Sequence, residues 1–110
     1  NIATQVQSLC ESYAYAISNG LSDDQYFKVL RNNTAWNYLA EYKEPKLRDK
    51  DYQPQFAIKN MLKDVRLALE TEQTKFGLRL LKETQAIFRQ ADEQGLGSED
   101  MIALYKQIHD

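Results

Sequence analysis

The hydrophobic and polar positions of residues 56–69 follow the period of a helix with two distinct faces. Apolar side chains recur every three or four residues and would line a core face: Ile58, Met61, Leu62, Val65, Ala68 and Leu69. At about 100° per residue, the opposite side collects an aromatic, an amide, an ammonium, a leucine and a bordering carboxylate: Phe56, Asn60, Lys63, Leu67 and Asp64. A mixed outer face of this kind is typical of a docking surface. Lone exposed apolar residues are also common, so periodicity alone leaves a merely solvated face equally open.

The same periodicity elsewhere predicts long helices at residues 2–18, 55–75 and 78–94, with Gly20 and Gly95 ending the first and the last. Strand patterns are nearly absent. The predicted fold class is therefore all-α, a bundle of about five to six helices. The inner face of the helix at 78–94 is expected to hold Leu80, Leu81, Thr84, Ile87, Phe88 and Ala91.

Shorter helices are predicted from their capping signals. Ser22 and Gln25 form a capping-box pattern that would start one short helix, and Thr34 would cap another. Residues 41–55 alternate in charge and contain two prolines, so an irregular segment is expected there. Ser98 would cap a last helix near the end of the chain.

Composition limits the classes of function. The 110 residues suffice for one domain, and a net charge of −2 with a pI of about 5.4 argues against nucleic acid as a partner. No apolar run approaches the roughly 20 residues of a membrane span, and the first residues do not resemble a signal peptide. The single cysteine, Cys10, permits no internal disulfide, which favours a reducing, cytoplasmic location. Its apolar neighbours predict a buried structural thiol rather than a nucleophile.

Other candidate chemistry is weak. The acidic pairs lack a second cluster with ligand spacing, so no metal site is predicted, and solvated helix faces explain them better: Asp23-Asp24, Glu70/Glu72 and Asp92-Glu93. His109 is too near the chain end to favour a catalytic pair.

Particular residue runs carry a family resemblance. Phe56-Ala57-Ile58-Lys59, followed by Lys63-Asp64-Val65-Arg66-Leu67-Ala68, resembles a signature in the C-terminal domain of the β-hydroxyacid dehydrogenase family. Three weaker pieces occur in the family order: Glu11, Asn19-Gly20-Leu21-Ser22 and the run from Gly95 to Met101. The family includes 3-hydroxyisobutyrate dehydrogenase, tartronate semialdehyde reductase and glyoxylate/succinic semialdehyde reductase. Together the pieces cover nearly the whole chain.

The resemblance implies both a fold and an activity. The fold would be that of the helical C-terminal domain of 6-phosphogluconate dehydrogenase-type enzymes. The parent protein would transfer a hydride between NAD or NADP and a small β-hydroxyacid or semialdehyde. Lys63 would reach the cofactor, whereas Phe56 and Asp64 would approach the substrate. From the residues alone, Lys63 and Asp64 could equally serve surface ion pairs, which contribute only a few tenths of a kcal/mol.

The resemblance also implies that essential parts of the enzyme lie outside this sequence. The family's catalytic lysine would fall about four helical turns before Glu11, upstream of Asn1, so no catalytic residue is assigned here. The Gly-x-Gly-x-x-Gly dinucleotide fingerprint does not occur in the sequence. Residues 1–110 would thus form a single C-terminal domain, inactive alone, that closes the substrate site and carries a homodimer contact. Its partner would be an N-terminal Rossmann domain of the same protein, which would bind most of the cofactor.

An alternative from a different class stays open. The amphipathic helices and the mixed face at Phe56 and Leu67 are also compatible with a non-catalytic helical module that binds a partner protein.

Overall fold

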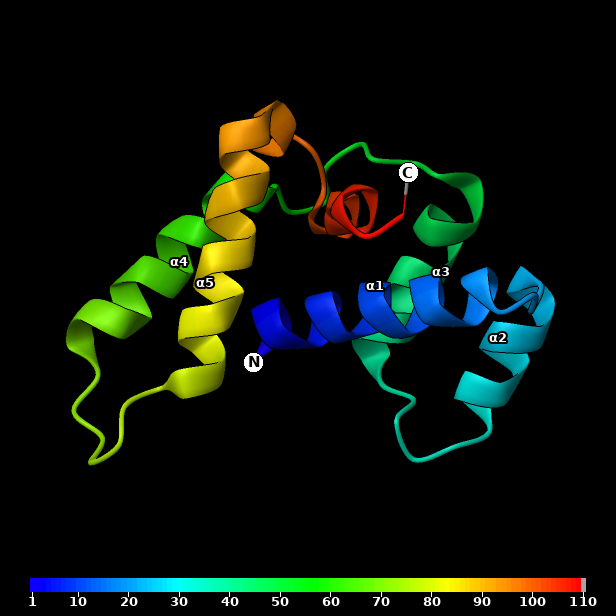
Figure 1. Ribbon diagram of the computed structural model, residues 1–110, viewed down its shortest axis with the longest axis horizontal. Coiled ribbons are helices and arrows are strands. Elements are labelled where there is room, and N and C mark those ends of the chain that lie inside the picture. Colours follow the sequence, from blue (N-terminus) through cyan, green and yellow to red (C-terminus); the bar gives the residue numbers. More distant parts are fainter. Residues whose placement is uncertain (110) are drawn as a thin grey trace.

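The computed structural model describes residues 1–109, and it confirms the predicted all-α fold (Figure 1). Five α-helices precede a π-helical turn and a 3₁₀ helix: α1 (Ile2–Ser18), α2 (Asp23–Arg31), α3 (Tyr38–Asp49), α4 (Ile58–Thr71), α5 (Arg79–Ala91), η1 (Asp92–Leu96) and η2 (Met101–Gln107). Within the described residues, extended pairing is limited to one isolated bridge between Ala57 and Asp100. None of these helices combines the length and apolarity needed to cross a membrane.

The helices pack around α1, which runs through the middle of the molecule (Figure 1). On one side α4 and α5 form an antiparallel pair that α1 meets with its N-terminal end. On the other side α1 contacts α2 and α3, and η2 lies along it. The most deeply buried side chains come from all of these elements: Val6, Cys10, Tyr13, Phe27, Leu47, Ile58, Leu62, Phe88, Ile102 and Leu104. One continuous core therefore holds the α4–α5 pair against the rest of the chain.

The first two helices form as predicted. Gly20 adopts a left-handed φ of 92° directly after α1 ends. The Ser22 side chain accepts from the Gln25 backbone amide, and the Gln25 side chain accepts from that of Ser22, so the capping box is complete.

Two predicted caps are wrong. Asn37 rather than Thr34 caps the third helix, because its side chain accepts from the Ala40 amide at 2.8 Å. Asp100 rather than Ser98 caps η2, accepting from the Ile102 amide at 3.0 Å. In both places several capping residues stand close together, so the sequence does not say which one the packing selects.

The prediction of an irregular segment at residues 41–55 is wrong for its first part, since α3 continues through Pro45 to Asp49, and is confirmed for residues 51–54, which form no helix. The alternating charges that suggested irregularity are ion pairs in the structure. Glu44 binds Arg48 one turn later at 2.8 Å and Arg31 of α2 at 2.5 Å. These ion pairs, together with burial of one side of the helix, offset the loss of the backbone hydrogen bond that Pro45 cannot donate.

The helix predicted at 55–75 is shorter in the structure, whereas the helix predicted at 78–94 is confirmed, because α5 runs directly into η1 and the helical backbone breaks at Gly95, where φ is 91°. Residues before Ile58 are extended because they pair with the segment before η2: the Ile58 amide donates to the Glu99 carbonyl, and the Met101 amide donates to the Phe56 carbonyl. The α5 face holds Thr84, Phe88 and Ala91 as predicted, but Leu80 is 69% exposed and does not belong to it. Tertiary pairing, which periodicity does not report, sets the start of α4.

Candidate functional site

A groove of about 710 Å³ lies between α1, α3 and α4. It is bounded by the start of α1, the start of α3, the extended segment before α4 and the first two turns of α4, with these lining residues: Ile2, Gln5, Asn37, Tyr38, Leu39, Tyr42, Lys43, Gln55, Phe56, Met61, Asp64 and Met101. A mostly apolar groove with a few polar groups is the usual form of a small-molecule site.

One wall of the groove is aromatic and open to solvent. Tyr38 is 77% exposed and stacks on Tyr42, with ring centroids 6.1 Å apart and an interplanar angle of 20°. Ile2 and Phe56 are also exposed. Large apolar side chains gathered on one surface indicate a place that another molecule or domain covers.

The floor of the groove is a buried ion pair. The Lys43 ammonium lies 3.0 Å and 3.1 Å from the two carboxylate oxygens of Asp100. The Lys43 side chain is 2% exposed and that of Asp100 is 0%. Buried charges at this depth require full pairing, and here each has several hydrogen-bond partners.

Asp100 also binds groups other than the Lys43 ammonium. Its Oδ1 also accepts from the backbone amides of Gln55 at 2.9 Å and Phe56 at 3.3 Å. The same carboxylate therefore ties α3, the start of η2 and the segment that carries Phe56 into one unit. The groove wall at Phe56 is held by main-chain bonds to a buried charge.

The structure brings two of the three predicted site residues together. Phe56 and Asp64 both line the groove, from the extended segment and from α4. Lys63 is exposed on α4 beside Asp64 but does not line the groove. Among residues 1–109, neither Lys63 nor Asp64 forms an ion pair, so the surface-pair alternative has no support in the structure.

Sequence reasoning missed Lys43 and Gln55, which also line this groove. Lys43 falls in the segment predicted to be irregular, and its partner Asp100 lies in the distant run from Gly95 to Met101. No local signal connects residues that are 57 positions apart.

The sequence profile described as the NAD-binding region of NADP-dependent 3-hydroxyisobutyrate dehydrogenase matches residues 2–108. The chain belongs to this family.

Individual members of the 3-hydroxyisobutyrate dehydrogenase family are similar over almost all of the chain. L-threonate dehydrogenase of Cupriavidus necator is 26% identical over 102 residues, which are 92% of this chain and 34% of that protein. Glyoxylate/succinic semialdehyde reductase 1 of Arabidopsis thaliana is 25% identical over 108 residues, which are 97% of this chain and 37% of that protein. The chain thus spans little more than a third of the length of these relatives.

A solved structure shares the fold. The crystal structure of 3-hydroxyisobutyrate dehydrogenase from Salmonella typhimurium superimposes with a TM-score of 0.88 at 25% identity. The matched region covers 96% of this chain and 38% of that one.

In this family member, Cys10 is inert as predicted. Its side chain is fully buried, and its thiol points at the Ile102 carbonyl oxygen, 3.8 Å away. Burial raises the pKa of the Cys10 thiol to about 12, so the nucleophilic thiolate is negligible at neutral pH.

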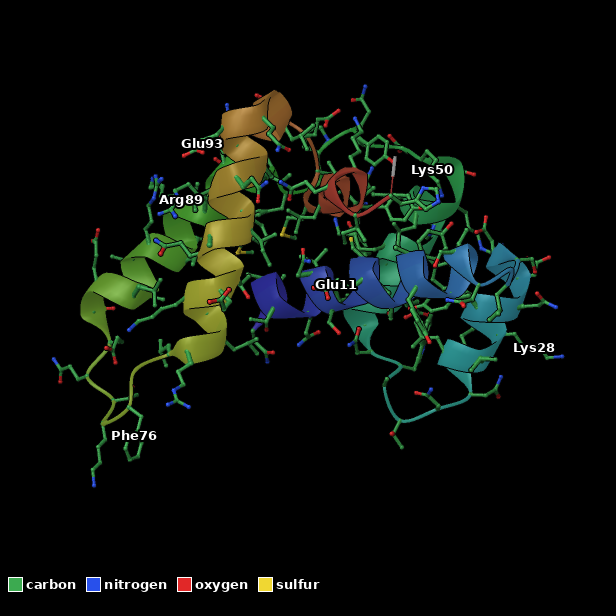
Figure 2. All side chains as sticks on the ribbon, in the orientation of Figure 1. Glu11, Lys28, Lys50, Phe76, Arg89 and Glu93 are labelled. Atoms are coloured by element: carbon green, nitrogen blue, oxygen red, sulfur yellow. The ribbon has the colours of Figure 1, made fainter. Side chains whose placement is uncertain are left out.

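A second polar cluster lies away from the groove, at the C-terminal end of α3. Lys50, in a left-handed conformation with φ 52°, donates to the Tyr13 hydroxyl at 2.8 Å. Its ammonium also lies 4.8 Å and 5.0 Å from the ring centroids of Tyr13 and Tyr105. Tyr13 in turn donates to Asp23 at 2.5 Å; burial, and then this bond, raise the pKa of Tyr13. Figure 2 shows Lys50 across η2 from the α4–α5 pair.

Proposed function

We propose that this chain is the helical C-terminal domain of an NAD(P)-dependent dehydrogenase that acts on small β-hydroxyacids or the corresponding semialdehydes. One observation carries the proposal: α4 presents Lys63 to solvent with no ion partner among residues 1–109, next to a groove lined by Phe56 and Asp64. Family membership over residues 2–108 supports the same assignment.

The side of α4 that carries Lys63 fits a phosphate-bearing dinucleotide. Lys59 and Arg66 lie one turn to either side of Lys63, and all three are exposed. None of them forms an ion pair among residues 1–109. NAD(P), when bound, supplies or accepts the hydride. Lys63 would donate hydrogen bonds to the cofactor and balance part of its negative charge.

The groove fits a small organic acid. The names of the relatives specify L-threonate, glyoxylate, succinic semialdehyde and 3-hydroxyisobutyrate, all of which carry a carboxylate. In this chain Phe56 would pack against the carbon skeleton of the substrate, and Asp64 would accept a hydrogen bond from its hydroxyl group.

The domain would act together with other parts of its protein. An N-terminal Rossmann domain would hold most of the cofactor and cover the aromatic wall formed by Tyr38 and Tyr42. The catalytic lysine and a homodimer contact complete the proposed enzyme. The rival function, a non-catalytic module, would place a partner protein on the same aromatic wall.

The test is Lys63→Met in the full-length protein. Losing a charge-assisted contact to the cofactor should raise KM for NAD(P) by roughly tenfold to a hundredfold. Lys63 is exposed and unpaired, so the free energy of unfolding should change by less than about 0.5 kcal/mol. Steady-state kinetics and urea unfolding measure the two quantities.

Lys28→Met is the matched control. Lys28 is an exposed lysine of α2, and Figure 2 shows it at the end of the molecule opposite α4. Its replacement should leave KM for NAD(P) unchanged. An unchanged KM in Lys63→Met as well would refute the role of Lys63, and a wild-type protein without NAD(P)-dependent turnover of any such acid would refute the function.

A further inference from the structure

Gln55 is held at the edge of the groove by both its main chain and its side chain. Its backbone amide donates to Asp100 Oδ1 at 2.9 Å, and its side-chain Oε1 accepts from Lys43 Nζ at 2.9 Å. Both partners belong to the buried ion pair at the groove floor. The Gln55 side chain itself is exposed and lines the groove.

The contact with Lys43 fixes which end of the amide is available. An ammonium group can only donate hydrogen bonds, so the Gln55 atom facing Lys43 must be the oxygen. The nitrogen, Nε2, is therefore the free end of the amide, and no side-chain hydrogen bond within residues 1–109 involves it. An amide whose oxygen accepts from a cation is polarised, which strengthens its two N–H donors.

We propose that Gln55 is a substrate-binding residue whose Nε2 donates to the carboxylate of the acid in the groove. This inference rests on the proposed function, and it adds a residue that the family signature does not include. Charge-assisted hydrogen bonds to a carboxylate are among the stronger polar contacts in proteins. Lys43 acts on the substrate through Gln55 and is a positioning residue.

The structural role of this side chain is limited to one bond from Lys43, whose ammonium keeps both carboxylate oxygens of Asp100 without it. The main-chain bond from Gln55 to Asp100 would form with any residue except proline, because it uses only the backbone amide. The side-chain amide adds directional donors at the groove surface. Its removal should therefore affect ligand recognition more than folding.

The decisive experiment uses two variants of the full-length enzyme. Gln55→Leu removes the donors without adding charge, and Gln55→Glu places a carboxylate where the substrate carboxylate would bind. Gln55→Leu should raise KM for succinic semialdehyde by roughly tenfold to a hundredfold with little change in kcat, and Gln55→Glu should raise it further. KM for NAD(P) should not change in either variant.

The matched control is Gln53→Glu. Gln53 is an exposed glutamine two positions away that does not line the groove, so this change adds the same charge without effect on KM. Thermal unfolding of every variant separates lost recognition from lost fold.

An uncharged aldehyde, butanal, supplies a second measurement. The wild-type enzyme should prefer succinic semialdehyde over butanal in kcat/KM, and Gln55→Leu should reduce that preference about tenfold or more. An unchanged preference in a folded, active variant would overturn the role of Gln55 while leaving the dehydrogenase function intact. A rise confined to KM for NAD(P) would assign the amide to the cofactor and overturn it equally. Absence of any turnover by the wild-type enzyme would instead remove the proposed function on which the inference rests.

Discussion

Lys43 of helix α3 and Lys50, the residue directly after that helix, face different ends of the core, and they are stabilised in different ways. Lys43 is buried under the groove and faces a carboxylate, that of Asp100, at 3.0 Å. Lys50 is exposed at the helix end and faces neutral groups, namely the hydroxyl of Tyr13 and the rings of Tyr13 and Tyr105.

The difference shows what solvent access allows. A lysine at the rim can keep part of its hydration, so aromatic faces and a hydroxyl are enough to hold it. A lysine with no water must have a full opposite charge and satisfied hydrogen bonds. The buried pair of Lys43 and Asp100 therefore needs more complete pairing than Lys50 does. The same buried pair positions Gln55 and Phe56.

The largest expected effect comes from breaking the buried pair. Asp100→Ala leaves the Lys43 ammonium buried without a counter-charge and removes the acceptor of three backbone amides. We expect a loss of about 3–5 kcal/mol in the free energy of unfolding. Urea unfolding followed by circular dichroism measures it.

A double-mutant cycle sharpens this result. Lys43→Met combined with Asp100→Ala should cost less than the sum of the two single changes, because the double variant leaves no unpaired buried charge. Strictly additive costs would mean that the two side chains do not interact as the structure indicates.

An intermediate effect is expected at the other lysine. Lys50→Met removes two hydrogen bonds, to the Tyr13 hydroxyl and the Leu47 carbonyl, and two cation–π contacts, which together stabilise the fold by about 1–2 kcal/mol. Lys50→Gly loses the same contacts but relieves the left-handed φ of 52°, so its cost should be smaller. If Lys50→Gly proved the more damaging of the two in thermal unfolding, the left-handed conformation would not be the strained feature that we describe.

The smallest expected effect is a change in how the free energy of unfolding depends on pH, and it comes from Cys10 in the core. Burial raises the pKa of Cys10 from 9.0 to about 12, so the unfolded chain releases this proton before the folded one does. The contribution of the buried Cys10 thiol to the free energy of unfolding is therefore fully present below pH 9. It falls as the pH rises toward 12, by roughly 1 kcal/mol between pH 9 and pH 10.

Cys10→Ala removes this contribution. The variant should lose less stability than the wild type between pH 8 and pH 10, while below pH 8 the two profiles should run parallel. Equal losses over the alkaline range would show that the thiol is not protected by burial. Tyr13, whose pKa is also raised, would add to the decline only above pH 10 in both proteins.

What the sequence could predict was local. The period of α1 and the capping box of Ser22 and Gln25 depend on neighbours within one turn, and both are confirmed. The exposed face of α4 could be predicted from the same helical period. The continuation of α3 past residue 41 was missed because the favourable ion pair between Glu44 and Arg31 lies outside the range of local patterns, whereas the penalty of Pro45 lies within it.

The candidate site divides in the same way. Phe56 and Asp64 could be assigned because the family resemblance lies on one continuous segment, and the structure places both at the groove. Gln55 could not be assigned, because its orientation depends on Lys43, which depends in turn on Asp100. Contacts between residues that are far apart in the sequence produce no periodic pattern, so they cannot be predicted from it.

Asp100 also affects the order in which the protein can fold during its synthesis on the ribosome. Its carboxylate binds the Gln55 amide across 45 positions of sequence, so the segment before α4 is synthesised before its anchor. Until Asp100 has left the ribosome, that segment lacks the two main-chain bonds that hold the groove wall at Phe56. The groove therefore takes its final form only after residues 55–100 have all been synthesised.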